Sequence, residues 1–210
     1  MSDIKILIRE YRDTDYTTCE ALVSEVWSLD VKFQPQEFST RVKNMYTQGS
    51  VIGSNFRVVL EINGRVVGFL FGLNEQQPKP DRDLIFESTV LWKILNIDGL
   101  SVRDKENLFS AINQHEKNRL AVMGRDKSEV VLCVVSPLFQ KNGYGKKLIY
   151  DFITHCKNDA VESIVVEANN FGSGDFYQAI GFQYRFGFDS PLHEYMGETR
   201  AACMYEYRIS

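Results

Sequence analysis

The feature that most constrains this chain is an apolar strand that leads through a glycine turn into a helix. The run from Val130 to Val135 shows no polar alternation, which is typical of a strand covered on both faces. A turn with Gly143 and Gly145 follows it, and residues 144–157 then show the apolar spacing of a helix. Such a turn directs backbone N–H groups and the positive end of the helix dipole at one point. The pattern predicts a binding site for a diphosphate.

Two common nucleotide motifs fit this turn poorly. A Walker loop needs Ser or Thr directly after its Lys to hold magnesium, whereas Lys147 follows Lys146 here. The dinucleotide fingerprint needs a third glycine at the position that Leu148 occupies. These mismatches argue against an ATP-dependent enzyme and against a dinucleotide-binding domain. The plain alternative, a tight turn without a ligand, stays open for Gly143 and Gly145.

Strand and helix patterns alternate along the chain. The dipeptide Asn63-Gly64 separates two β-rich runs and predicts a hairpin, because both central residues must adopt positive φ. Helices are expected after Asp13 or Asp15 and after Pro35, and two more around 144–157 and 173–180. The expected strands are 4–9, 56–62, 65–73, 129–135, 163–167, 182–186 and 204–209.

Residues 74–127 interrupt this alternation. They begin with a polar stretch that carries Pro78 and Pro80, and two helical patterns follow, one around Phe86 to Ile94 and one around Leu108 to Met123. We interpret this segment as a helical insertion packed on the domain, with a separate lid as the alternative.

Two motifs together resemble the GNAT acetyltransferase superfamily. The first is Gln140-x-x-Gly143-x-Gly145 after a strand that ends Val-Ser-Pro, which is similar to the coenzyme A signature of that family. The second is Asn170 followed by Tyr177-x-x-x-Gly-Phe, in the same order and spacing as the family's later motif. The insertion departs from the family, which usually has a short connection there. The resemblance implies one N-acetyltransferase domain over residues 1–210, with an α/β (α+β) fold: a mixed, largely antiparallel central sheet flanked by helices, and the insertion between its third and fourth strands.

The resemblance also implies a reaction. The chain would bind acetyl-CoA as co-substrate, with no metal, and transfer the acetyl group to a primary amine of a small-molecule or peptide acceptor by direct attack. Tyr177 would be the general acid, since a phenol with a pKa of about 10 keeps its proton at neutral pH. The coenzyme-binding residues carried over from the family are Cys133, Val134, Val135, Gln140, Lys141, Asn142, Gly143, Tyr144, Gly145, Lys146, Asn170 and Tyr177.

Other roles stay open for several of these residues. Tyr177 could be a core tyrosine with an amphipathic ring, and Asn170 could cap the following helix. Candidates by type for the general base are Glu87, Glu129 and Glu167. The aromatic residues Trp27, Phe33, Tyr46 and Trp92 could line an acceptor pocket, although packing is the more common role. We expect the insertion and the irregular stretch 188–200 to border the acceptor site.

Composition excludes some classes of function. The chain has 24 basic and 28 acidic residues, a net charge of −4, which argues against a nucleic-acid partner. No stretch approaches the roughly 18 apolar residues of a membrane span. The four cysteines are far apart, as in a cytoplasmic protein with reduced thiols. His115, His155 and His193 show no ligand spacing, which favours structural or surface roles.

Two further questions stay open from the sequence. A non-catalytic domain that binds CoA or acyl-CoA as a sensor or regulatory partner is the alternative function. Polyamines, aminoglycosides and lysine side chains are all compatible acceptors. A homodimer is a further expectation, because exposed insertions often mediate dimers.

Overall fold

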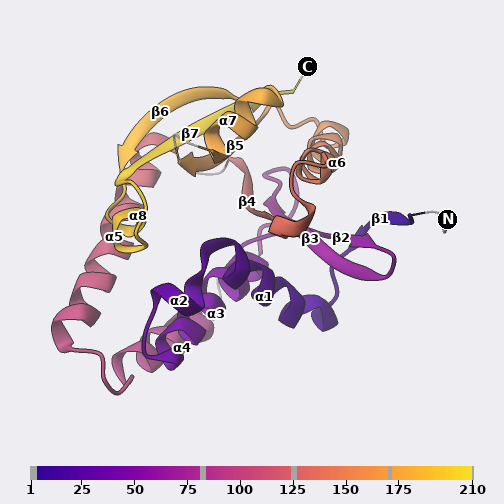
Figure 1. The fold of residues 1–210 in the computed structure, drawn as a ribbon. Coiled ribbons are helices and arrows are strands. Elements are labelled where there is room, and N and C mark those ends of the chain that lie inside the picture. Colours follow the sequence, from indigo (N-terminus) through magenta and orange to yellow (C-terminus); the bar gives the residue numbers. More distant parts are fainter. Residues whose placement is uncertain (1–3, 81–83, 124–126, 170–171, 210) are drawn as a thin grey trace.

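The computed structural model describes residues 4–80, 84–123, 127–169 and 172–209. Within them, one seven-stranded sheet has the strand order β1-β2-β3-β4-β5-β7-β6 (Figure 1). Its neighbouring strands are antiparallel except for the parallel pair β4 and β5. The predicted mixed, largely antiparallel sheet is therefore confirmed. The strands are β1 (Ile6–Glu10), β2 (Phe56–Ile62), β3 (Arg65–Leu73), β4 (Ser128–Val135), β5 (Ser163–Asn169), β6 (Gln183–Asp189) and β7 (Ala201–Arg208).

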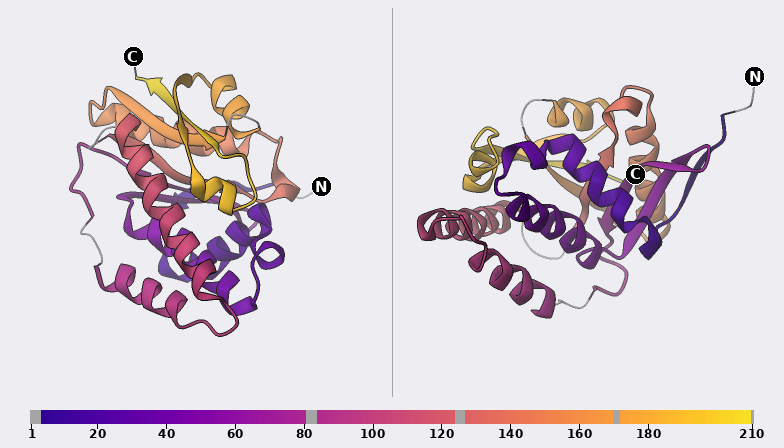
Figure 2. Two further views of the ribbon diagram at one scale, coloured as in Figure 1. Left: turned by 90° about the vertical axis from the view of Figure 1, so that its left-hand side faces the viewer. Right: turned by 60° about the horizontal axis from the view of Figure 1, so that its bottom comes forward.

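Helices cover both faces of the sheet (Figure 1 and Figure 2). On one face, Leu148 and Phe152 of α6 pack with Leu60 of β2 in one apolar cluster. On the other face, Val23 of α1 and Phe69 of β3 belong to a second cluster. The helices are α1 (Tyr16–Trp27), α2 (Leu29–Lys32), α3 (Gln36–Ile52), α4 (Leu84–Leu95), α5 (Val102–Met123), α6 (Tyr144–Asn158), α7 (Ser173–Ala179) and α8 (Pro191–Tyr195). None of the described helices combines the length and the apolar character that crossing a membrane requires.

The hairpin of β2 and β3 has the predicted bounds. Asn63 and Gly64 have φ values of 49° and 81°, so both central residues of the turn are left-handed, as the dipeptide predicts. The helix after Pro35 begins at Gln36, with Pro35 at its N-cap position. The cause of these agreements is local, because turn chemistry alone determines both features.

The predicted N-cap position of α1 is confirmed at Asp15, but the role of its side chain and the prediction for the stretch 188–200 need correction. Asp15 occupies the N-cap position of α1, but its side chain makes no capping hydrogen bond to that helix. Its carboxylate instead accepts bonds from the Arg9 guanidinium, at 2.8 and 2.9 Å, and from the Arg12 amide. The stretch 188–200, expected to be irregular, contains α8, which starts at Pro191 and is capped by the Ser190 hydroxyl. A serine at the N-cap followed by proline in the first turn is a local signal for the start of a helix.

Two helices, α4 and α5, separate β3 from β4, as the insertion at residues 74–127 predicts. Val90 and Ile94 of α4 and Leu108 of α5 are buried in the same apolar cluster as Phe69 of β3. Helix α5 also contacts α8 and β6 (Figure 2). Helix α4 therefore packs against α3 and α5, and α5 brings its polar face close to the junction of β4 and β5.

Candidate active site

The site is built around the point where the two parallel strands separate. Strands β4 and β5 pair only through Ser128 with Ile164 and Glu129 with Val165, within the part of the chain that the structure describes. Farther along β4, residues 133–135 pair with β3 on the opposite side. The edge of β4 that faces β5 therefore has backbone groups available beyond Glu129. An exposed strand edge of this kind can pair with an extended ligand.

A cavity of about 920 Å³ occupies this split. Its wall includes Val166 and Tyr177, which belong to the apolar cluster under α6, and Trp27 and Tyr46, which pack against the cluster on the other face. Because side chains from both faces line it, the cavity reaches through the sheet between β4 and β5.

The turn before α6 has the geometry expected for anion binding. Lys141 and Gly143 have φ values of 62° and 78°, and Gly143 is the N-cap of α6. The amide of Lys147 bonds to the carbonyl of Gly143, so the helical amides before it have no acceptor within the helix. Gln140 lines the cavity, and its side-chain amide donates to the carbonyl of Val135 at 2.9 Å. Gln140 thereby fixes the turn to the end of β4.

Tyr177 is placed beside β4 by the short helix α7. Its ring packs edge-on against Phe176 and Phe182, with interplanar angles of 68° and 64° and centroids 5.1 and 5.3 Å away. Burial raises the pKa of the phenol well above its ordinary value, and the nearby Cys133 acts in the same direction. Tyr177 therefore carries its proton at neutral pH. Burial also raises the pKa of Cys133 to about 12, so this thiol is not an activated nucleophile.

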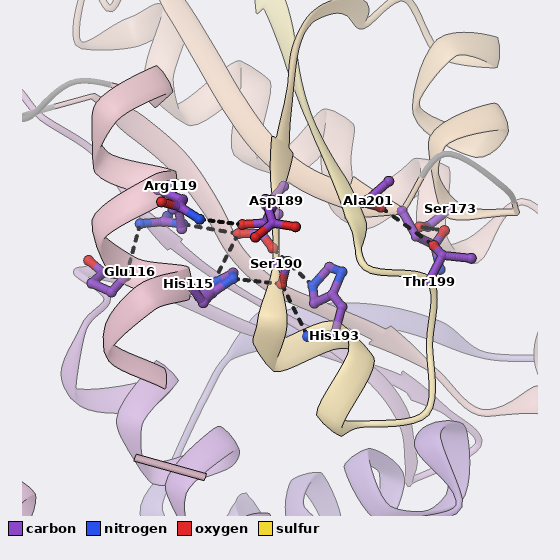
Figure 3. A network of polar contacts seen from close by, with 12 residues as sticks. His115, Glu116, Arg119, Ser173, Asp189, Ser190, His193, Thr199 and Ala201 are labelled. Atoms are coloured by element: carbon purple, nitrogen blue, oxygen red, sulfur yellow. Dashed lines mark hydrogen bonds and ion pairs between the residues drawn. The ribbon is translucent and has the colours of Figure 1, made fainter. Parts of the chain in front are cut away.

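A cluster of charged residues borders the cavity on the α5 face (Figure 3). Arg119 of α5 pairs with Glu129 of β4 and, at 3.1 Å from its Nε to Oε2, with Glu167 of β5. His193 of α8 lies 3.0 Å from Glu167, measured from Nε2 to Oε1. His115 of α5 approaches the other oxygen of Glu167 at 3.6 Å. We call these five residues the polar cluster. It joins four elements, α5, β4, β5 and α8.

The pKa shifts within the polar cluster follow from burial and from these contacts. Burial raises the pKa of Glu129 despite the adjacent guanidinium of Arg119. Burial also opposes the charge of Glu167, but the bond from His193 and the surrounding positive charges outweigh it and lower the pKa. Burial lowers the pKa of His115. For His193 burial is again unfavourable to the cation, but the contact with Glu167 outweighs it and raises the pKa.

The same cluster contains potential metal ligands. His115, Glu167 and His193 each offer one ligand atom, and these atoms lie within 4.8 Å of one another. A metal ion at this position would lie beside the guanidinium of Arg119, which already contacts Glu167. Like charges this close repel, so the arrangement suits an ion-pair network better than a cation site.

The structure brings together several of the residues singled out in the sequence and leaves others apart. Tyr177, Cys133, Val134, Val135 and Gln140 line the cavity. The remaining turn residues, 141–146, lie just before α6 and in its first turn, and they are not among the residues that line the cavity. Asn170 lies outside the described residues, as does the side chain of Glu87.

Among the candidate bases, Glu129 and Glu167 both line the cavity. Of the aromatic residues, Trp27 and Tyr46 line it and stack on each other at 6.3 Å between ring centroids. Phe33 is buried, whereas Trp92 is exposed on α4.

Sequence spacing did not indicate the roles of His115, Arg119 and His193. His115 and His193 are far apart in the chain and meet only because α5 packs against α8. The sequence places Arg119, a basic residue, in a helix that also contributes buried apolar residues to the core. It does not show which acidic residues pair with Arg119, because the two partners come from separate strands.

Comparison with known proteins agrees with this architecture. Residues 99–186 match the family model of the acetyltransferase (GNAT) domain. A search of curated proteins gives no significant match. Among solved structures, a GNAT-family protein from Desulfovibrio desulfuricans is 11% identical with a TM-score of 0.57, covering 98% of this chain and 100% of that one. The PaiA N-acetyltransferase from Thermoplasma acidophilum, solved with coenzyme A, is 12% identical with a TM-score of 0.56, covering 97% and 99%.

A third structure, of Ard1 from Thermoplasma volcanium, is 14% identical with a TM-score of 0.55 and covers 98% of both chains. At these identities the structural likeness concerns the fold, whereas the family model recognises the sequence itself. The GNAT resemblance indicated by the two motifs is thus confirmed: residues 99–186 match the family's acetyltransferase domain, and the chain has the GNAT fold.

Proposed function

We propose that this chain is an N-acetyltransferase that moves the acetyl group of acetyl-CoA to a primary amine by direct attack. The observation that carries the proposal is the cavity between β4 and β5, which is lined from both faces of the sheet. One face provides the turn before α6 and the phenol of Tyr177. The other provides the polar cluster and the stacked pair Trp27 and Tyr46. We also propose that residues 1–210 act as one domain, with 74–127 as its insertion.

In this proposal the coenzyme occupies the α6 face. The free amides at the start of α6 and the turn residues Lys141–Lys146 bind the pyrophosphate, because a helix N-terminus favours an anion. The open edge of β4 at residues 133–135 pairs with the amides of the pantetheine arm in the manner of an added strand. An amide from the same stretch polarises the thioester carbonyl. Asn170 is proposed to bond to the pantetheine.

Tyr177 acts as the general acid. The neutral amine attacks the carbonyl carbon, the carbon–sulfur bond breaks, and the electron pair moves to sulfur. Tyr177 donates its proton to that sulfur, a role that suits a phenol whose burial keeps it protonated. Because the acceptor must arrive as a free amine, a base on the other face has to accept a proton.

The acceptor is proposed to enter from the face where α5, α8, Trp27 and Tyr46 line the cavity. Both the insertion, through α5, and the stretch 188–200, through α8, contribute to that wall, which supports the expectation that they border the acceptor site. Small-molecule and peptide amines both remain candidates. A homodimer and a cytoplasmic location, both expected from the sequence, remain proposals as well.

Ligand-dependent melting tests the coenzyme part of the proposal. A ligand at 100 times its Kd adds about 2.7 kcal/mol to the free energy of unfolding. Acetyl-CoA and CoA should each raise the melting temperature, and magnesium-ATP should not. A rise in melting temperature with magnesium-ATP alone would instead support an ATP-dependent enzyme. A shift with acetyl-CoA but no turnover would support the non-catalytic sensor.

A further inference from the structure

The polar cluster leaves one basic atom without a partner. Both oxygens of Glu167 are engaged, Oε1 by His193 and Oε2 by Arg119. Glu129 is paired with Arg119. The Nδ1 atom of His115 lies 2.9 Å from the Ser190 hydroxyl. By contrast, Nδ1 of His193 is buried and has no hydrogen-bond partner among the described residues. A buried polar atom without a partner costs free energy and calls for a functional explanation.

The orientation of His193 is fixed at two points. Its backbone amide donates to the Ser190 hydroxyl at 3.1 Å, which caps α8. Its ring Nε2 lies 3.0 Å from Oε1 of Glu167, a contact that requires the proton to be on Nε2 because a carboxylate only accepts. In the neutral ring the lone pair is then on Nδ1. The carboxylate therefore selects the tautomer in which the unpartnered nitrogen is basic.

We propose that His193, oriented by Glu167, is the general base that removes the proton from the acceptor amine through its Nδ1 atom. This inference rests on the proposed acetyl transfer and adds the residue that the reaction still lacks. The side chains of His193 and Tyr177 line the same cavity and come from α8 and α7. Nδ1 itself is buried, so the imidazole has to shift within the cavity wall for this atom to meet the amine. Glu167 is a positioning residue, since it acts through His193.

The proton balance is complete with these two side chains. As the amine nitrogen forms its bond to the carbonyl carbon, one N–H proton passes to Nδ1 of His193. The electron pair of the breaking carbon–sulfur bond goes to sulfur, which receives the proton of Tyr177. The amide and the free thiol leave, and solvent carries the proton from the imidazolium back to the phenolate. No further reactant is required.

Several charged groups face His193. Glu167 comes from β5, and Glu198 follows α8 and also favours the imidazolium. His115 and Arg119 come from α5, and both are close to the same carboxylate. Glu129 completes the cluster from β4 through Arg119. The negative charges outweigh burial, so the pKa of His193 lies above its ordinary value, and base catalysis should weaken as the pH falls through it.

His193→Gln is the test variant, because its amide can still donate to Glu167 but cannot accept a proton at neutral pH. We expect kcat with acetyl-CoA and an acceptor from a panel of spermidine, kanamycin and a lysine-containing peptide to fall about 10²- to 10⁴-fold. The melting shift with acetyl-CoA should be unchanged. His155→Gln is the matched control, because His155 packs against Phe56 away from this cavity, and its kcat should stay at the wild-type value.

Glu167→Gln separates positioning from a merely structural role. The loss of the carboxylate charge should move the acid limb of the kcat/KM profile to lower pH. Independently of activity, an NMR titration of the wild type should give the His193 ring a pKa above the reference value of about 6.5, and Glu167→Gln should lower it.

Each outcome bears on a definite claim. If the wild type turns over and His193→Gln keeps its kcat and pH profile, the assignment of His193 is overturned while the acetyltransferase proposal stands. If the wild type binds acetyl-CoA but transfers no acetyl group, the proposed function fails and the assignment fails with it. A His193 pKa that does not respond to Glu167→Gln would overturn the positioning role.

Discussion

Gly145, in the first turn of α6, lies so close to Phe176 of α7 that an added Cβ would be 3.2 Å from the Cζ atom of that ring. Phe176 precedes Tyr177 in the chain and its ring packs against the Tyr177 ring, so the proposed phosphate turn and the proposed acid are linked through Phe176. The two sequence motifs therefore meet in space. Changes in the turn can be expected to affect coenzyme binding before they affect the rest of the fold.

Gly143→Asp should abolish the melting response to acetyl-CoA. The new carboxylate would repel the pyrophosphate, while Asp tolerates the positive φ of 78° better than most residues. Gly64→Asp is a matched control, because Gly64 has a φ of 81° and, like Gly143, open space around its Cβ position. The control should keep the full response to acetyl-CoA. A loss in both variants would mean that backbone strain, and not the ligand, is responsible.

Tyr177→Phe should lower kcat by at least about 10²-fold, because general acid catalysis contributes on that order. The KM for acetyl-CoA should change little, since the ring and its packing remain. Tyr207→Phe provides the comparison. Tyr207 packs against the same Phe182 at 5.3 Å and is not among the residues that line the cavity. Steady-state kinetics would contradict the acid role if the two variants had equal kcat values.

Arg119→Met should destabilise the fold by roughly 3–5 kcal/mol, because it leaves Glu129 and Glu167 without their shared cation. Adding Glu129→Gln should restore part of this loss. Arg208→Met removes a guanidinium that is 75% exposed and should cost less than about 1 kcal/mol. Urea unfolding measures all three variants. Equal losses for Arg119 and Arg208 would argue against the buried network.

The pKa of His193 predicts a pH-dependent contribution to stability. A raised folded-state pKa stabilises the native state fully below the unfolded value of about 6.5, and the contribution is lost as pH rises through the folded value. His193→Gln should therefore cost more free energy of unfolding at a pH of about 5.5 than at about 9. His115, whose pKa burial lowers, has the opposite effect, so the difference between wild type and variant is the quantity to compare.

Trp27→Ala should raise the KM for the acceptor several-fold and leave the acetyl-CoA response intact, because Trp27 lines the cavity on the proposed acceptor face. Trp92→Ala is the control. Trp92 is 64% exposed on α4 and does not line this cavity. Its removal should therefore leave the KM for the acceptor and the melting response to acetyl-CoA unchanged. If Trp27→Ala lost the melting response to acetyl-CoA, the assignment of this face to the acceptor would be wrong.

Local signals made much of the fold predictable from the sequence. The Asn63-Gly64 turn, the apolar run of β4 and the glycine turn before α6 each depend on residues that are adjacent in the chain. Their physical causes, positive φ, burial on both faces and open helix amides, can be recognised without a tertiary structure.

The polar cluster could not be predicted in the same way. Glu129 and Glu167 were candidates by type alone, because their ion pairs depend on Arg119. The meeting of His115 and His193 depends on how α5 crosses to α8, which neither spacing nor composition specifies. Tertiary packing, and not local chemistry, determines this half of the site.

Amine-dependent thiol release is the measurement that tests the central claim most directly. The wild type would be incubated with acetyl-CoA and each acceptor of the spermidine, kanamycin and lysine-peptide panel, with free thiol and acetylated amine measured together. We predict equal amounts of the two products for at least one acceptor, and a much lower rate of amine-dependent thiol release in Tyr177→Phe. Acetyl-CoA binding without amine-dependent thiol release for any acceptor would contradict the account and favour a non-catalytic coenzyme sensor.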